Sequence, residues 1–109
     1  MDTIIGTKQY IENHFDQDIN LEMLSHIRFV SKYHLQRTFK RYYGLSPKQY
    51  LIDVRIKKAK EFLCSGMTVT ETCFAVGFDS LGSFSTLFKR RVGISPAAFQ
   101  KAQVSRSKS

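Results

Sequence analysis

FKRYYGLSP at residues 39–47 and FKRRVGISP at residues 88–96 are nearly the same stretch, which occurs twice in a chain of 109 residues. Gly after such a run is typical of a helix end, because Gly enters the left-handed backbone conformation at little cost. Ser followed by Pro is typical of the cap and the first position of the next helix. Each copy therefore predicts the end of one helix and the start of another, and the repeat predicts a duplicated helical unit.

Helical periodicity continues outward from both copies, and few strand signals are present. We therefore expect an all-α fold. The expected helices span residues 3–15, 21–27, 31–43, 46–64, 69–76, 80–92 and 95–102. The residues expected to cap them include Asn20, Ser31, Ser46, Thr68 and Ser80. The apolar residues expected to face inward include Ile4, Ile11, Leu21, Leu24, Ile27, Leu35, Phe39, Ile52, Ile56, Ala59, Leu63, Phe84 and Phe88.

The charge of the chain is strongly positive and unevenly distributed. Lys and Arg number 17 against 9 Asp and Glu, which gives a net charge of +8. No acid occurs at residues 23–52 or after Asp79, and each acid-free span contains one copy of the repeat. A small basic domain of this kind usually binds a polyanion, most often nucleic acid. The alternative is a solvated basic face without a partner.

Each half of the chain has the arrangement of a helix-turn-helix: a short helix, a turn, a capped second helix and a basic surface. In this motif the second helix enters the major groove of DNA by its N-terminal part. The duplication then supplies in one chain what a dimer supplies with two. Two rival classes stay open: a nucleoid-type protein that binds DNA without sequence preference, and a helical module whose basic face docks an acidic protein.

The residues around both copies resemble a known family. GFDSLGSFSTLFKRRVGISPAAF at 77–99 resembles the signature of AraC/XylS-type bacterial transcription regulators. VSKYHLQRTFKRYYGLSPKQYL at 30–51, followed by Arg55 and Ala59, resembles that family's other half. The resemblance covers roughly residues 3–102. It implies a promoter-binding activator or repressor in the bacterial cytoplasm, with double-stranded DNA and RNA polymerase as partners and with no cofactor and no membrane.

The resemblance also implies a domain organisation. Residues 1–102 are expected to form a seven-helix DNA-binding domain, in which a linker helix at about 46–64 joins helix-turn-helix subdomains at about 1–45 and 67–102. Residues 103–109, rich in Ser, Lys and Arg, are expected to form a flexible basic tail. Family members often carry a separate effector domain. Since this chain contains none, we expect a stand-alone regulator or a fragment.

The sequence departs from the family pattern in its first turn. Phe29 stands where the family usually has a Gly, so we expect another backbone shape there. Aligning the halves 49 residues apart pairs Phe29 with Phe78, and the second turn, which keeps Gly77, is one residue longer than the first. The packing positions where the family usually has Ala, Ile and Ala are occupied by Ser25, Thr72 and Cys73.

The first recognition helix is expected to supply most of the sequence reading. Gln36 can bond adenine and Arg37 can bond guanine in bidentate geometry, while Tyr33 can pack against sugar or a thymine methyl. These three positions also match those at which the family makes base contacts. The alternative for each is a surface side chain that touches only phosphate. The phosphate contacts expected in this half are Ser31, Lys32, Lys40, Arg41 and Lys48.

The second recognition helix offers weaker readers. Leu81, Gly82 and Thr86 occupy its expected base-contact positions, and the strongest contact available to them is an apolar one with a thymine methyl. We therefore expect this half to add phosphate anchoring and shape reading. Its expected phosphate contacts are Ser80, Lys89 and Arg90. The two helices are expected in successive major grooves about 34 Å apart, on a site of about 20 bp without two-fold symmetry.

No catalytic or metal site is predicted. His14, His26 and His34 lack the spacing of metal ligands, and there is no Gly-rich phosphate loop. Cys64 and Cys73 are expected to be reduced and partly buried. The alternatives for them are a redox-sensing pair, or the reactive cysteine that some DNA-repair proteins carry beside a domain of this type. The sequence shows no signal peptide and no apolar run long enough to span a membrane.

Overall fold

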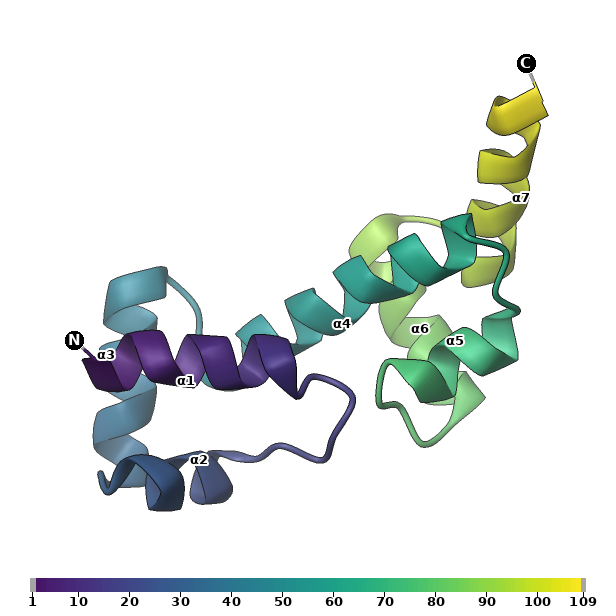
Figure 1. Ribbon diagram of the computed structural model, residues 1–109. Coiled ribbons are helices and arrows are strands. Elements are labelled where there is room, and N and C mark those ends of the chain that lie inside the picture. The colour runs from purple at the N-terminus through teal and green to yellow at the C-terminus, as the bar shows by residue number, and fades with distance from the viewer. Residues whose placement is uncertain (1, 109) are drawn as a thin grey trace. The chain divides into compact units, whose positions relative to one another are not determined.

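The computed structural model describes residues 2–108, with side chains described for residues 3–103. Every regular element in this range is an α-helix, so the predicted all-α class is confirmed (Figure 1). The helices are α1 (Asp2–Asn13), α2 (Leu21–Arg28), α3 (Lys32–Tyr43), α4 (Pro47–Cys64), α5 (Val69–Ala75), α6 (Leu81–Val92) and α7 (Pro96–Lys108). The chain divides into two compact units, Met1–Val54 and Arg55–Ser109, and the division falls within α4.

The predicted helix caps form in both units. Side-chain oxygens of the cap residues accept the backbone N–H three positions further on, at 2.8 to 3.1 Å. These caps are Asn20, Ser31, Thr68 and Ser80. Gly44 ends α3 at φ 83°, and Gly93 ends α6 at φ 100°. After the first of these, Ser46 and Gln49 form a reciprocal capping box at the start of α4. The repeated stretch is therefore a helix–turn–helix junction, as its sequence predicted.

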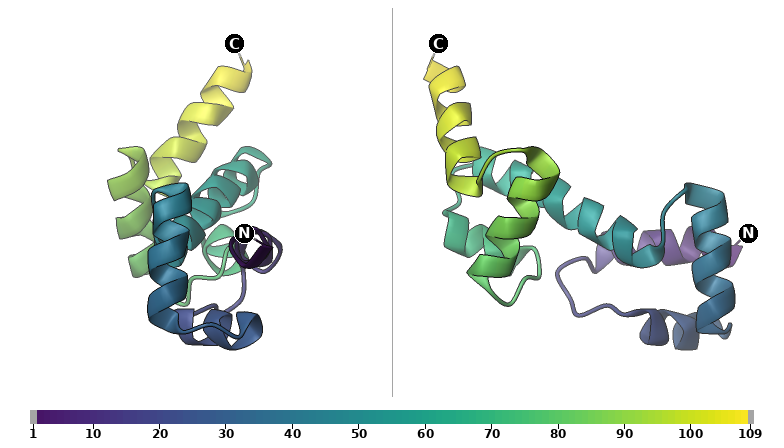
Figure 2. Two further views of the ribbon diagram at one scale, coloured as in Figure 1. Left: turned by 90° about the vertical axis from the view of Figure 1, so that its left-hand side faces the viewer. Right: turned by 180° about the vertical axis from the view of Figure 1, so that it is seen from behind.

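In the first unit α1 and α2 both contact α3, and Figure 2 shows the three helices from two further sides. Leu35 and Phe39 of α3 are fully buried among them. Ile27 was expected in this core, but it is 38% exposed. Each residue turns a helix by about 100°, so a step of three residues falls about 60° short of a full turn. That drift carries Ile27 away from the side of α2 that Leu24 and Ser25 bury.

An arginine connects α1 to the end of α2. Nη2 of Arg28 donates to the carbonyl oxygen of Gly6 at 2.8 Å. A Cβ atom on Gly6 would lie 2.8 Å from this guanidinium, so only glycine admits the arginine at that point of α1. Arg28 therefore stabilises the unit from within, although it belongs to the acid-free span that the sequence presented as a basic surface.

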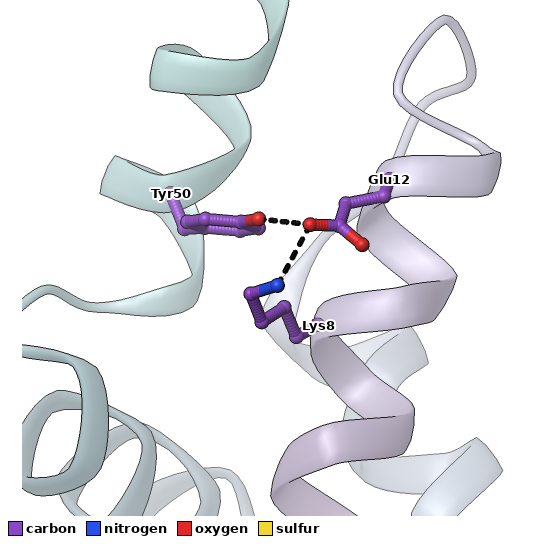
Figure 3. A network of polar contacts seen from close by, with 3 residues as sticks. All are labelled: Lys8, Glu12 and Tyr50. Atoms are coloured by element: carbon purple, nitrogen blue, oxygen red, sulfur yellow. Dashed lines mark hydrogen bonds and ion pairs between the residues drawn. The ribbon is translucent and has the colours of Figure 1, made fainter.

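A network of three side chains, two from α1 and one from α4, connects the N-terminal part of α4 to α1 (Figure 3). The hydroxyl of Tyr50 donates a short hydrogen bond to Oε2 of Glu12, and Nζ of Lys8 lies 2.9 Å from the same oxygen. Burial raises the pKa of Tyr50, and the hydrogen bond to Glu12 raises the pKa of Lys8. Both shifts favour the protonated form of the donor, in which the hydroxyl and the ammonium group can donate to Glu12.

In the second unit α6 contacts both α5 and α7, and four aromatic rings follow one another through the core. The ring centroids of Phe78, Phe84, Phe88 and Phe99 are 5.3, 5.7 and 5.6 Å apart in that order. Ile56, Ala59 and Leu63 of α4 are buried in the same unit. The aromatic series places α6 firmly on α7, because tilted ring pairs at this spacing attract beyond the area they bury.

The last helix is longer than predicted. Nε2 of Gln100 donates to the carbonyl oxygens of Leu63 and Met67 at 3.0 and 2.7 Å, which fastens α7 to the C-terminal end of α4. The sequence placed the end of this helix at Ala102, whereas α7 continues to Lys108. Basic residues and Ser are compatible with an α-helix, so a polar composition alone does not end one.

Candidate nucleic-acid interface

The two helix-turn-helix turns share one backbone pattern. The amides of Phe29 and Gly77 each donate to a carbonyl three residues back, and the following amide in each turn donates to a carbonyl five residues back. Phe29 adopts φ 56° and Gly77 adopts φ 97°, so both lie in the left-handed region. The expectation of another backbone shape at Phe29 is therefore wrong. The hydrogen bonds of the turn require this conformation, whichever residue stands there.

The pairing of Phe29 with Phe78 is wrong for the same reason. Phe29 takes the place of Gly77, and its side chain is 94% exposed. Phe78 is half-buried against the core, with its ring 5.3 Å from that of Phe84. Counted from the left-handed residue, the second turn has one more residue before its recognition helix, so an alignment that fits the helices is displaced by one residue in the turn. Counted from the end of the preceding helix, as in the prediction, residues 29–31 form the first connection and residues 76–80 the second, so the predicted difference of one residue is too small.

Gly77 is required for a second reason. A Cβ atom there would lie 2.9 Å from the guanidinium of Arg55, which is also 5.6 Å from the centre of the Phe78 ring. The arginine thus packs over the second turn from α4. A larger residue at position 77 would have to displace it as well as adopt a left-handed backbone.

Both recognition helices begin with a serine whose hydroxyl is only partly used. Ser31 accepts the N–H of His34 at 3.1 Å, and Ser80 accepts the N–H of Ser83 at 3.1 Å. Accepting uses a lone pair of the hydroxyl oxygen and leaves its hydrogen atom available for donation. Each serine is exposed, so each can cap its helix and still donate to an anion.

The outward face of α3 carries the three predicted base readers. Tyr33 is 73% exposed, and Gln36 and Arg37 are exposed beside it. The guanidinium carbon of Arg37 lies 4.9 Å from the centre of the Tyr33 ring. The sequence analysis treated these two side chains as separate contacts, although a spacing of four residues on a helix is a signal for such a pair.

The side chains at the predicted base-contact positions of α6 are smaller than those of α3. Leu81 is 41% exposed, and Gly82 and Thr86 are exposed as well. A Cβ atom on Gly82 would meet nothing within 4 Å. The helix therefore leaves free space where α3 presents Tyr33, which stands 49 residues earlier at the matching position.

The predicted phosphate contacts are also accessible. Neither α3 nor α6 contains an acidic residue, and both have basic residues in their last turn. Every predicted lysine and arginine contact is exposed, as are the two cap serines. These residues are Ser31, Lys32, Lys40, Arg41, Lys48, Ser80, Lys89 and Arg90. Each unit thus presents a capped helix with an accessible, positively charged outer surface.

The matches to known proteins agree with this geometry. The model of a helix-turn-helix domain family, which is of the AraC/XylS type, matches residues 24–102. The DNA-binding domain of AdpA, solved in complex with a target DNA, superposes with a TM-score of 0.91 at 28% identity, over 97% of this chain and 96% of that one. The C-terminal domain of AraT, a response regulator from Geobacillus stearothermophilus, superposes with a TM-score of 0.90 at 34% identity, over 94% and 86% of the two chains.

The chain belongs to the AraC/XylS family of transcription regulators. Its curated relatives in the family are longer. The transcriptional activator RhaS of Escherichia fergusonii is 34% identical over 95 residues, which are 86% of this chain and 34% of RhaS. The bifunctional transcriptional activator/DNA repair enzyme AdaA of Bacillus subtilis is 34% identical over 94 residues, which are 85% of this chain and 44% of AdaA. The chain therefore spans less than half the length of either relative.

The cysteines of this AraC-type domain differ sharply from each other. Cys64 is exposed at the end of α4, whereas Cys73 is fully buried, so the expectation that both are partly buried is wrong. The thiol of Cys73 donates to the carbonyl oxygen of Ser80 at 3.4 Å, and burial raises its pKa. A raised pKa disfavours the reactive thiolate, so Cys73 supports the start of α6 by packing. The repair activity in the name of AdaA belongs to that longer protein.

One of the three histidines, His14, contacts an aromatic ring of its own helix. The ring of His14 stacks on that of Tyr10, with centroids 4.2 Å apart. Within the described residues, no group of three or more His, Cys, Asp or Glu side chains is placed to hold a metal ion. No helix in the described part of the chain is long and apolar enough to cross a membrane.

Proposed function

We propose that this AraC-type domain binds double-stranded DNA at a specific sequence and thereby regulates transcription from a promoter. The observation that carries the proposal is the exposed, acid-free outer face of a capped recognition helix in each unit, α3 and α6. A helix presented in this way can enter the major groove by its N-terminal part. The positive charge on the same faces attracts the phosphate backbone.

We assign the base contacts to the exposed residues near the start of each helix. In α3 these are Tyr33, Gln36 and Arg37, of which Gln36 suits adenine and Arg37 suits guanine. In α6 they are Leu81, Gly82 and Thr86, which can offer only apolar or small contacts. The first unit therefore supplies most of the specificity, and the second contributes affinity and sensitivity to DNA shape.

The phosphate contacts position the protein without carrying sequence information. Each neutralised phosphate steepens the dependence of binding on salt by about 0.9 in the slope of log K against log salt. Replacing Lys40 or Lys89 by alanine should therefore lower affinity equally for all sequences and reduce that slope by about one.

The regulatory partner is a further part of the proposal. AdaA and RhaS are named as activators, and both come from bacteria. By analogy we propose that a protein containing this domain acts in the bacterial cytoplasm and meets RNA polymerase at the promoter. The proposed effect on transcription rests on that analogy, whereas DNA binding rests on the faces of α3 and α6.

The decisive experiment is selection from a random pool of DNA duplexes, followed by gel-shift titration at two salt concentrations. We expect a selected site of about 20 bp without two-fold symmetry. It should bind at least about a thousandfold more tightly than random duplex. Equal binding of all sequences would assign the domain to non-specific nucleoid proteins. Absence of retardation at moderate salt would favour a module that docks an acidic protein.

A further inference from the structure

Tyr33 and Arg37 form a stacked pair on the outer face of α3. A helix places residues four apart one above the other, so the phenol ring lies under the guanidinium. The guanidinium carbon is 4.9 Å from the ring centre, and both side chains are exposed. Nothing in the core of the unit explains this arrangement, since Leu35 and Phe39 bury the opposite face of the helix.

Contact with the ring of Tyr33 lowers the entropic cost of ordering Arg37 when DNA binds. A long side chain in solvent samples many rotamers, and ordering it on binding costs conformational entropy. An aromatic ring attracts the flat face of the guanidinium and restricts its orientation. The five N–H donors of arginine lie in the plane of the guanidinium. A guanidinium that lies flat over the ring therefore keeps its donating edge free.

We infer that Tyr33 is a positioning residue that holds Arg37 for bidentate donation to O6 and N7 of a guanine. The two residues then read a single G·C pair as one unit. This inference rests on the proposed function, because it requires α3 in the major groove. It replaces the base contact of its own that is proposed above for Tyr33, in which the ring would touch a thymine methyl or a sugar and the two residues would act independently.

Two other arginines of the recognition helices have no aromatic residue four positions before them. Arg41 follows Arg37 by four residues, and Arg90 follows Thr86 by four, so neither has an aromatic ring at the matching position. The positions of α6 that match the pair hold Gly82 and Thr86. At these matching positions the pair of ring and arginine thus occurs in α3 and not in α6, and α3 is where the strongest base readout is expected.

A double-mutant cycle on the selected DNA site tests the inference. Arg37→Ala should lower the preference for guanine at one base pair by about fivefold to a hundredfold. Tyr33→Ala should lower the preference at that same base pair by about twofold to fivefold, and Tyr33→Phe should retain it because the ring remains. In the Arg37→Ala background, Tyr33→Ala should have no further effect on base preference.

Two matched controls accompany the cycle. Tyr42→Ala removes an exposed tyrosine from the same helix without touching the pair, and it should leave the preference at that base pair unchanged. Replacing the guanine by 7-deazaguanine removes the N7 acceptor, so the difference between the parent protein and Tyr33→Ala should largely disappear on that DNA. Thermal melting of each variant checks that the fold is intact.

The outcomes separate the inference from the proposed function. If Tyr33→Ala still changes base preference in the Arg37→Ala background, or acts at another base pair, Tyr33 is an independent contact and the inference is overturned. If Arg37→Ala weakens all sequences equally, Arg37 contacts phosphate, and the inference fails while specific binding stands. If selection yields no preferred site, the proposed function itself fails.

Discussion

The helices α3 and α6 are built alike on their inner side and differently on their outer side. Both begin at a capping serine, bury residues at matching positions and end at a left-handed glycine. On the outside, α3 carries the stacked Tyr33 and Arg37, where α6 has Gly82 and Thr86. The fold constrains the inner positions because they must pack, while it leaves the outer positions free. The repeated stretch therefore marks the scaffold, and the reading surface lies in the residues that do not repeat.

The largest expected effect comes from the inner side. Phe39 and Phe88 stand at matching positions and are both fully buried. Replacing either by alanine should lower the free energy of unfolding by about 3–5 kcal/mol, since each change opens a cavity in its own unit. Denaturant unfolding of the two variants measures this. A much smaller loss for one of them would show that the two scaffolds are not equivalent.

A transplant of the pair would sharpen the comparison on the outer side. Gly82→Tyr together with Thr86→Arg should give α6 a new preference for guanine of about 1–3 kcal/mol at one base pair. The space around Gly82 is open, so the ring can be accommodated. The control is Gly82→Ala with Thr86→Arg, which adds the arginine without the ring and should give a weaker preference. Selection from random DNA measures both, and equal preferences would mean that the ring is irrelevant.

The two turns offer a third comparison. Gly77→Ala should cost about 1–2 kcal/mol of unfolding free energy, because alanine is strained in a left-handed backbone and Arg55 must move. Phe29→Ala should change stability by less than about 0.5 kcal/mol, because a non-glycine residue already occupies that conformation and the side chain is exposed. Thermal unfolding of both variants decides the point. Equal losses of unfolding free energy would contradict this expected difference, which follows from the left-handed backbone that the two positions share.

The smallest effect concerns the helix that precedes each turn. Leu24 in α2 and Thr72 in α5 lie at the same distance from their turns, and both are buried. The hydroxyl of Thr72 is buried without a hydrogen-bond partner. Thr72→Val should therefore stabilise the protein by about 1 kcal/mol, measured by thermal unfolding. Ser25→Ala should give no such gain, because that hydroxyl donates to the carbonyl oxygen of Glu22 at 2.8 Å.

Much of the fold was predictable because its signals act over short distances. The caps at Ser31, Ser46 and Ser80 bond to amides three residues away, and Gly44 and Gly93 end their helices through their own backbone conformation. The exposure of the predicted site residues followed from the helical period that buries Leu35, Phe39, Phe84 and Phe88. Their contacts with DNA stay predictions. The predicted end of the last helix at Ala102 was wrong, because a polar composition alone does not end an α-helix.

The sequence by itself determined the bounds of the helices to within two residues, with the end of α7 as the exception. It also determined which side of each recognition helix is apolar, since both properties depend on neighbours within a few residues. Only the tertiary structure decided that Arg28 turns inward to Gly6 and that Cys73 is buried while Cys64 is exposed. These outcomes depend on which distant groups pack together. A linear pattern does not record such contacts, because they form only when the chain has folded.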